Sequence, residues 1–416
     1  MTSTDVVVIG GGQAGLAAGW CAREAGVDHV ILEQGRIAQR WRSGSWDSLR
    51  LLTPRWQSRL PGQAYRGAAP DGYMSAPELI EYLESYAHGY AANVRENTRV
   101  LDVRAAAQRR YRVQTDAGAL EARAVIVATG HCQLPCVPAF AAQLDPSVLQ
   151  LSAPSYRNPD QLPAGGVLVV GASATGLQLS EELARSGRPV TLAVGPHLRV
   201  PRCYRGRDLL WWLDRAGILK RPAESVSDLG AARRAPSFQL VGAEPRRTLD
   251  LPALLEAGVR LTGRLQASVG RWLHFAPTLP ADTRDADEQM HRLLDRIDVF
   301  ADELEGAATR VVRPAPFVPR VTPGALHVGR ERIRTLLWAT GFRRDYGWLG
   351  LPVLDQHGEI LHRGGVTPER GLYVLGLPFL RRRDSSFLDG VGADAQAVLA
   401  HVRRYLDGTL GSREAA

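Results

Sequence analysis

Two glycine-rich segments have the residue types and spacing that suit a phosphate-containing cofactor. The first follows a short apolar run and contains Gly10, Gly12, Gln13, Ala14 and Gly15. In this GxGxxG pattern the glycines allow a tight turn, a close approach of the backbone to a diphosphate, and close packing of strand and helix. Glu33 ends the next apolar run, where an acid accepts hydrogen bonds from an adenosine ribose. The pattern predicts a dinucleotide whose diphosphate binds at a helix N-terminus.

The second segment repeats this pattern after another apolar run. It contains Gly171, Ser173, Ala174, Thr175 and Gly176. Val194 takes the place of Glu33, because it lies 18 residues after the last glycine, as Glu33 does. Four cationic side chains follow it, namely His197, Arg199, Arg202 and Arg205, of which the first three are the candidate contacts. Because arginine near this position suits a ribose 2′-phosphate, we expect NADPH rather than NADH. The alternative is that these are ordinary solvated charges.

These loops need strands and helices that hold them in position. Two further apolar runs end in Ala-Thr-Gly, at Ala128, Thr129 and Gly130 and at Ala339, Thr340 and Gly341. Each is expected to return the chain to a sheet beside a nucleotide, where glycine leaves room for the ligand. A last helix is expected from Gly390 and Val391 to about residue 406. Its N-terminus would face a flavin ring and stabilise negative charge there. Two dinucleotide folds in one chain predict a flavin nucleotide and a nicotinamide nucleotide that reduces it.

Composition excludes several other classes of protein. The chain has 416 residues and a net charge of +8, and its arginines are dispersed, so no nucleic-acid partner is expected. No apolar stretch reaches the length of a membrane span, and we expect a cytoplasmic protein without membrane contact. The four cysteines form no CxxC pair, so we expect buried packing thiols rather than a redox dithiol or a metal site.

With these motifs the sequence resembles the flavin-containing monooxygenases of the two-dinucleotide-fold type. The resemblance runs through both glycine loops, both Ala-Thr-Gly segments, Tyr156–Pro159 and the stretch from Trp41 to Pro61. It implies an α/β fold with two Rossmann-like domains, the FAD domain being split around an inserted NADPH domain. We place the FAD domain at 1–160 and 335–416, and the NADPH domain at 161–334 with a helical insertion at about 205–310. Further cofactor contacts are expected from Gln34, Arg40, Trp41, Trp46, Leu52 and Thr53.

The resemblance also implies a reaction. NADPH would reduce FAD, the flavin would react with O2 to a C4a-hydroperoxide, and one oxygen atom would pass to a small-molecule substrate. No catalytic side chain is predicted, because the flavin performs the chemistry. Oligomeric state stays open, a homodimer being one option.

One family motif is missing. The FxGxxxH fingerprint, aligned on Tyr156, meets Ser152 where its histidine belongs. We therefore expect N- or S-oxygenation rather than Baeyer–Villiger chemistry. An NADPH-dependent flavin oxidase or reductase, which makes peroxide or reduces a partner, is the alternative, and a non-enzymatic redox-sensing module is a third.

Two groups of residues have more than one interpretation. An apolar stripe with helical spacing runs from Ala286 to Leu304, and it is either core packing or a lid or dimer contact. Candidate substrate contacts are Trp46, Trp56, Tyr65, Trp211, Arg381–Arg383 and Phe387. Each of these side chains fits packing or solvent exposure equally well.

Overall fold

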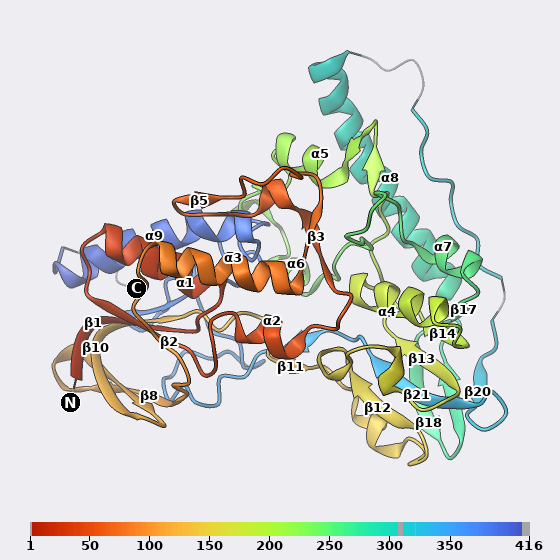
Figure 1. The fold of residues 1–416 in the computed structure, drawn as a ribbon, viewed down its shortest axis with the longest axis horizontal. Helices are drawn as coiled ribbons and strands as arrows, with labels where there is room; N and C mark the ends of the chain where they lie inside the picture. The colour runs from red at the N-terminus through yellow and green to blue at the C-terminus, as the bar shows by residue number, and fades with distance from the viewer. Residues whose placement is uncertain (1, 307–310, 321, 410–416) are drawn as a thin grey trace.

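A computed structural model describes residues 2–306, 311–320 and 322–409 of the chain (Figure 1). It shows two separate, mostly parallel sheets, each flanked by helices, as the α/β prediction requires. The first sheet lies at the left of Figure 1 with α1, α3 and α9, and the second lies at the right with α4.

The first sheet carries the first glycine loop. Its strands, in order, are β7 (Val94–Arg95), β2 (His29–Leu32), β1 (Thr2–Ile9), β10 (Gly118–Val127), β9 (Arg110–Thr115) and β8 (Val100–Ala106). A late segment, β23 (Leu372–Val374), adds to β10 in parallel. β1 is the central strand because its run from Val6 to Ile9 is β-branched and buried on both faces. This sheet therefore joins strands from both ends of the chain.

Three helices cover this sheet: α1 (Gln13–Glu24), α3 (Ala76–Gly89) and α9 (Leu388–Leu406). α1 packs against both α3 and α9. α3 begins at a capping box, in which the Ser75 side chain and the Glu78 side chain each bind the other's backbone N–H. α9 begins two residues before Gly390, so the predicted start lies within its first turn.

The second sheet carries the second glycine loop and is entirely parallel. Its strands, in order, are β12 (Leu149–Ser152), β21 (Ile333–Trp338), β13 (Gly166–Val170), β14 (Val190–Ala193) and β17 (Arg260–Thr262). Two helices, α4 (Ala174–Arg185) and α7 (Leu251–Glu256), pack against each other beside it. Every residue of β13 and β14 is buried, which explains why both strands are apolar except at Thr191.

The segment from 205 to 310 is not only helical. It includes α5 (Leu209–Arg215), α6 (Leu229–Arg234) and α8 (Leu279–Glu305), but also β17, β18 (Leu265–Val269) and β19 (Trp272–Phe275). β18 and β19 form a small antiparallel sheet with β20 (Ala325–His327). The stripe on α8 is core packing: Met290, Leu294 and Ile297 are buried against α5, whereas Leu304 at its end is 46% exposed.

Further short elements lie outside the two large sheets. They are α2 (Gln39–Gly44), β3 (Arg50–Pro54), β4 (Arg59–Leu60), β5 (Gln63–Ala64), β6 (Tyr73–Ser75), β11 (Leu134–Pro135), β15 (Cys203–Tyr204), β16 (Arg207–Asp208) and β22 (Phe342–Arg343). β11 and β22 pair antiparallel, so the two linkers between the sheets run side by side.

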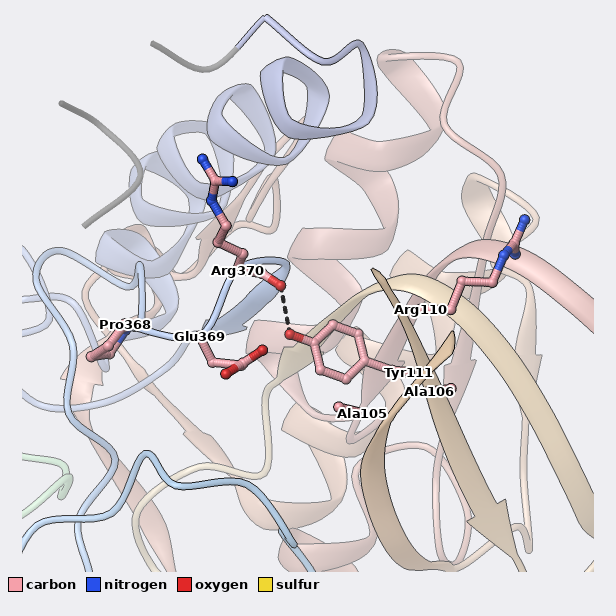
Figure 2. Close-up of a pocket in the computed structure, with 7 residues that line it drawn as sticks. All are labelled: Ala105, Ala106, Arg110, Tyr111, Pro368, Glu369 and Arg370. Atoms are coloured by element: carbon pink, nitrogen blue, oxygen red, sulfur yellow. Dashed lines mark hydrogen bonds between the residues drawn. The ribbon is translucent and has the colours of Figure 1, made fainter. Parts of the chain in front are cut away.

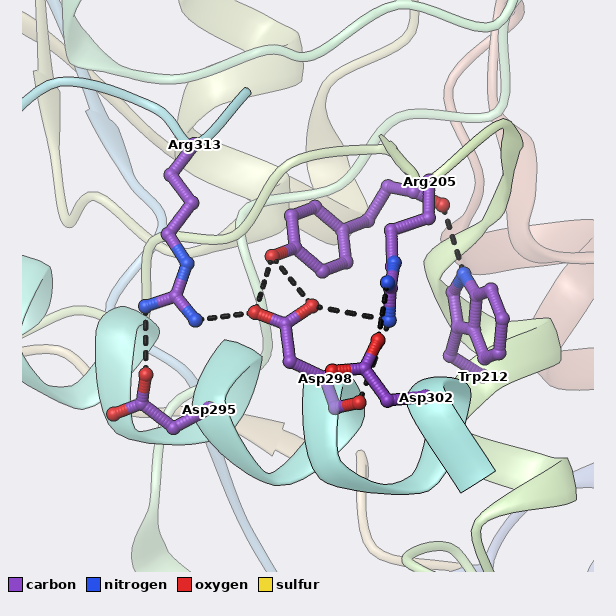
Figure 3. Close-up of polar contacts among 7 residues, drawn as sticks. Arg205, Trp212, Asp295, Asp298, Asp302 and Arg313 are labelled. Atoms are coloured by element: carbon purple, nitrogen blue, oxygen red, sulfur yellow. Dashed lines mark hydrogen bonds and ion pairs between the residues drawn. The ribbon is translucent and has the colours of Figure 1, made fainter. Parts of the chain in front are cut away.

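Polar contacts fasten the long helix α8 to its neighbours (Figure 3). The Tyr204 hydroxyl donates to Asp298, and Arg205 forms an ion pair with Asp302. On the other side of Asp298, Arg313 pairs with Asp295 at 2.6 Å, as Figure 3 shows. The helix thereby ties the start of the inserted segment to the stretch that leads back to β20.

The cysteines match expectation only in part. All four cysteines are free, but only Cys21 is buried; Cys203 is exposed, so the prediction of buried packing thiols is wrong there. In the part of the chain that the structure describes, no helix is both long and apolar enough to cross a membrane. Likewise, the described residues contain no group of three or more metal-ligating side chains placed to bind one ion.

Candidate functional site: two dinucleotide loops

The first glycine loop is fixed by contacts that only glycine permits. Gly10 has a φ of +114°, and a Cβ on it would lie 2.6 Å from the carbonyl oxygen of Ala128. A Cβ on Gly15 would lie 1.8 Å from the Gly10 carbonyl oxygen. These clashes involve backbone atoms, which cannot rotate away. The loop is therefore pressed between α1 and the first Ala-Thr-Gly segment, as the sequence predicts.

Space for a ligand remains beside this loop. A Cβ built on Gly12 meets no atom of the described residues within 4 Å. Gly12 is also the N-cap of α1 and supplies no side-chain cap, so the first N–H groups of the helix have no side-chain partner there. Free N–H donors at a helix N-terminus bind diphosphate. The site therefore fits the phosphates of a dinucleotide.

Glu33 is held at the end of β2 by two backbone donors. The N–H of Gly11 donates to its Oε2 at 2.6 Å, and the N–H of Gly35 donates to its Oε1 at 3.0 Å. Burial raises the pKa of Glu33, and these N–H groups partly oppose that rise. Each carboxylate oxygen keeps further acceptor capacity for a ribose hydroxyl.

The other predicted contacts of the first fold surround this loop. Gln13 donates its amide to the carbonyl of Ser386 at 2.7 Å, next to the start of α9. Thr129 has a buried hydroxyl without a partner, and Gly130 has a φ of +72° with open space around it. The buried side chains are Ala14, Trp46, Ala128 and Val391, and the partly buried ones are Trp41, Leu52 and Thr53. Gln34 is exposed.

Gln57 is a candidate that the sequence did not reveal. It lies in the short 3-10 turn Arg55–Gln57, between β3 and β4, and its side chain is 1% exposed. Both its amide nitrogen and its amide oxygen are buried without a hydrogen-bond partner. An orphaned buried amide is costly, and a polar ligand would satisfy it. The signal is tertiary, since the surrounding sequence contains no motif.

The second glycine loop has the same backbone construction. Gly171 has a φ of +109°, and a Cβ on it would lie 2.4 Å from the carbonyl oxygen of Ala339. A Cβ on Gly176 would lie 1.7 Å from the Gly171 carbonyl oxygen. Ser173 is the N-cap of α4 and makes no side-chain cap, as at the first loop. Each Ala-Thr-Gly segment thus supplies the alanine carbonyl against which the first glycine of a loop packs.

A peptide segment crosses the second loop and binds its N-cap side chain, which Gly12 at the first loop lacks. We call residues Ser237–Leu240 the strap. The Ser173 hydroxyl donates to the Ser237 carbonyl at 3.0 Å, and the Gln239 amide donates to the Ala172 carbonyl at 2.8 Å. The Gln178 amide donates to the Leu240 carbonyl at 3.0 Å. The strap therefore forms one wall of the second site.

The cations after β14 differ from expectation. The Arg199 guanidinium is buried, 2.9 Å from Asp250 and 2.6 Å from Asp287. Arg202 is 1% exposed and paired with Asp208. Their donors are used within the protein because three carboxylates lie against them.

His197 is 3% exposed, contacts the Gly195 carbonyl and has its pKa lowered by burial. The structure thus does not present these three side chains to a ligand.

The linkers bring the second Ala-Thr-Gly segment next to β11. The Thr340 hydroxyl donates to the Cys136 carbonyl, and the Cys136 N–H donates to the Gly341 carbonyl at 2.9 Å. Arg40, on α2, lies 5.0 Å from the centre of the Phe342 ring, and burial lowers its pKa. His131, which follows Gly130, is buried enough that its pKa falls to about 4.

Two cavities of about 310 Å³ each lie apart from the glycine loops. Figure 2 shows the first, at β8 and β9, where the Tyr111 hydroxyl donates to the Arg370 carbonyl at 2.6 Å. The second is lined by Pro222, Glu224, Arg381, Arg382, Ala393, Asp394 and Ala397. It contains two of the arginines proposed as substrate contacts, and burial raises the pKa of its Asp394 to about 6. Neither cavity includes a residue of a glycine loop.

The fold and the paired loops define a two-dinucleotide-fold oxidoreductase. A family model described as pyridine nucleotide-disulphide oxidoreductase matches residues 7–200. An uncharacterized CzcO-like oxidoreductase of Geobacillus kaustophilus is 33% identical over 95% of this chain and 97% of its own length. The chain therefore belongs to the family of CzcO-like oxidoreductases.

Two further proteins are similar to this chain. The indole-3-pyruvate monooxygenase YUCCA1 of Oryza sativa is 31% identical over 45% of this chain and 47% of its own length. A flavin-containing monooxygenase from Stenotrophomonas maltophilia has the same fold, with a TM-score of 0.66 and 22% identity over 98% of this chain and 100% of its own. The resemblance to flavin-containing monooxygenases and the assignment as an oxidoreductase are thereby confirmed.

Proposed function

We propose that the chain is an FAD- and NADPH-dependent monooxygenase that transfers one oxygen atom from O2 to a nitrogen or sulfur of a small molecule. The observation that carries the proposal is the duplicated site. Gly10 packs on Ala128 as Gly171 packs on Ala339, and each loop opens a helix without a side-chain cap. The monooxygenase names of the relatives support the reaction class.

We assign FAD to the first loop and NADPH to the second. Glu33, held by two N–H groups, suits an adenosine ribose without a 2′-phosphate. Val194 at the second loop is apolar and offers no acid that would repel a 2′-phosphate. We keep the domains proposed from the sequence, 1–160 with 335–416 and 161–334. All strands of the first sheet lie within 1–160 or 335–416, but these boundaries also enclose β12 and most of β21, which pair in the second sheet.

FAD would supply the redox chemistry, by accepting a hydride and activating oxygen. The residues of the chain bind and orient it. The first N–H groups of α1 would hold the diphosphate, and Glu33 would fix the ribose. Gln57 would offer one donor and one acceptor to a polar ring edge, because neither of its amide atoms has a protein partner. The N-terminus of α9, with Phe387 as an uncapped N-cap, would stabilise negative charge.

The test is to reduce the flavin-loaded enzyme with NADPH without oxygen and then to mix it rapidly with oxygen. If the protein is a monooxygenase, its reduced flavin is expected to react readily with oxygen. With an amine or thioether substrate under ¹⁸O2, it is expected to give ¹⁸O-labelled product in proportion to the NADPH consumed. If an electron acceptor reoxidises the reduced flavin but oxygen does not, the protein is a reductase and not a monooxygenase. If the molar amount of peroxide equals that of NADPH consumed, whichever amine or thioether is added, the protein is an oxidase.

A further inference from the structure

The end of β14 raises a specific problem for a cofactor with a 2′-phosphate. In this fold the adenosine ribose is recognised where the second strand ends. Here that strand ends at Ala193 and Val194, both buried and apolar. Arg199 and Arg202 are already paired with buried carboxylates. A dianionic phosphate at this place therefore needs a different cation.

The neighbouring strand β17 places a cation, Arg264, at the same edge of the sheet. β17 runs parallel to β14 with Thr262 opposite Ala193, so the residues that follow both strands leave the sheet together. Gly263 continues β17, and a Cβ on it would lie 1.8 Å from the Ala276 carbonyl oxygen. The Ala276 N–H donates to the Arg264 carbonyl at 2.8 Å. These contacts fix the backbone from which Arg264 extends.

The Arg264 side chain lies over the turn that follows β14. Its Cβ, Cγ and Cδ atoms lie 3.8–4.0 Å from the position of a Cβ on Gly195. Arg264 is exposed, and among the described residues its guanidinium has no ion-pair or hydrogen-bond partner. Arg260, at the opposite end of β17, instead pairs with Glu331 at 2.9 Å. Arg264 is thus an unpaired cation at the ribose end of the second site.

We propose that Arg264 binds the 2′-phosphate of NADPH and sets the preference for NADPH over NADH. This inference rests on the proposed function, because it assumes a nicotinamide dinucleotide at the second loop. Arginine presents several N–H donors in a planar fork that matches a phosphate group. Gly195 leaves the aliphatic part of the Arg264 side chain room to pack beside the turn that follows β14.

The experiment measures binding of two probes to the flavin-loaded protein by titration calorimetry: adenosine 2′,5′-bisphosphate and 5′-AMP. The parent protein is expected to prefer the bisphosphate. Arg264→Ala and Arg264→Gln are expected to weaken bisphosphate binding by about 10- to 100-fold, as loss of charge-assisted hydrogen bonds does, and to leave 5′-AMP binding unchanged. The control is Arg260→Gln, on the same strand. This variant is expected to keep the parent's ratio of affinities for adenosine 2′,5′-bisphosphate and 5′-AMP.

Two results would overturn the inference, and they are distinguishable. If the parent prefers the bisphosphate and both Arg264 variants keep that preference, another cation binds the phosphate and the proposed function stands. If the parent binds neither probe nor NADP⁺, the second loop is not a nicotinamide nucleotide site and the proposed function fails as well. Flavin content, measured for each variant, checks that the fold is intact.

Discussion

The two glycine loops share a backbone but differ in what surrounds them. At both, glycine packs on the carbonyl of an Ala-Thr-Gly alanine, and a helix opens without a side-chain cap. Beside the first loop, Gly12 adjoins open space and Glu33 is held in place. Beside the second, Ser173 binds the strap and Val194 replaces the acid. The motif therefore determines the local backbone, whereas the neighbouring residues determine which nucleotide each loop suits.

The largest expected effect separates the two loops directly. Gly12→Val is expected to abolish flavin retention, because its side chain would fill the space that a diphosphate needs, although no described protein atom lies within 4 Å of the Cβ position. Flavin released on denaturation, quantified per chain, measures the effect. Gly324→Val, also in open space but far from the loop, is the control. If the Gly12 variant keeps its full flavin content, the assignment of FAD to the first loop is wrong.

The next effect is on stability. Arg199→Ala leaves Asp250 and Asp287 buried without their cation, so the free energy of unfolding is expected to fall by about 3–5 kcal/mol. Denaturant unfolding measures it, with the exposed Arg292→Ala as the control. If stability is unchanged while NADP⁺ binding weakens, Arg199 is a ligand-binding residue, as the sequence predicted.

A smaller effect is expected at the second loop. Ser173→Val removes the hydroxyl that contacts the strap and adds bulk where the diphosphate approaches, so the Kd for NADP⁺ is expected to rise about tenfold, near the upper end for one hydrogen bond. Flavin content should stay that of the parent. Ser147→Val, on an exposed turn, is the matched control. Loss of flavin from the Ser173 variant would reverse the assignment of the two loops.

The sequence predicted the parts of this site that local sterics determine. Gly10, Gly15, Gly171 and Gly176 lie where any side chain would clash with backbone, so their pattern alone reveals the loops. The pairing of Arg199 was not predictable, because its carboxylate partners are 51 and 88 residues away.

Other features of the site depend on tertiary structure in the same way. The strap comes from a segment without a motif, and the orphaned amide of Gln57 is recognised only once its burial is known. Arg264 became a candidate only through the order of the strands, which sets β17 beside β14.

The smallest effect concerns pH. Burial lowers the pKa of His131 to about 4, so the folded protein binds fewer protons there than the unfolded chain does. The resulting stabilisation is present above the ordinary histidine pKa of about 6.5 and is lost as the pH falls toward 4. His131→Asn is expected to flatten this part of the stability–pH curve, measured as Tm from pH 7 to 4. An unchanged slope would mean that His131 titrates normally.

We propose that the two loops hold the electron donor and the electron acceptor of one reaction. Mixing the flavin-loaded enzyme with NADPH in the absence of oxygen, while following flavin absorbance, tests it most directly. We expect the flavin absorbance to bleach, at a rate that saturates with NADPH. Flavin that stays oxidised although NADPH is bound would show that the two sites do not exchange electrons.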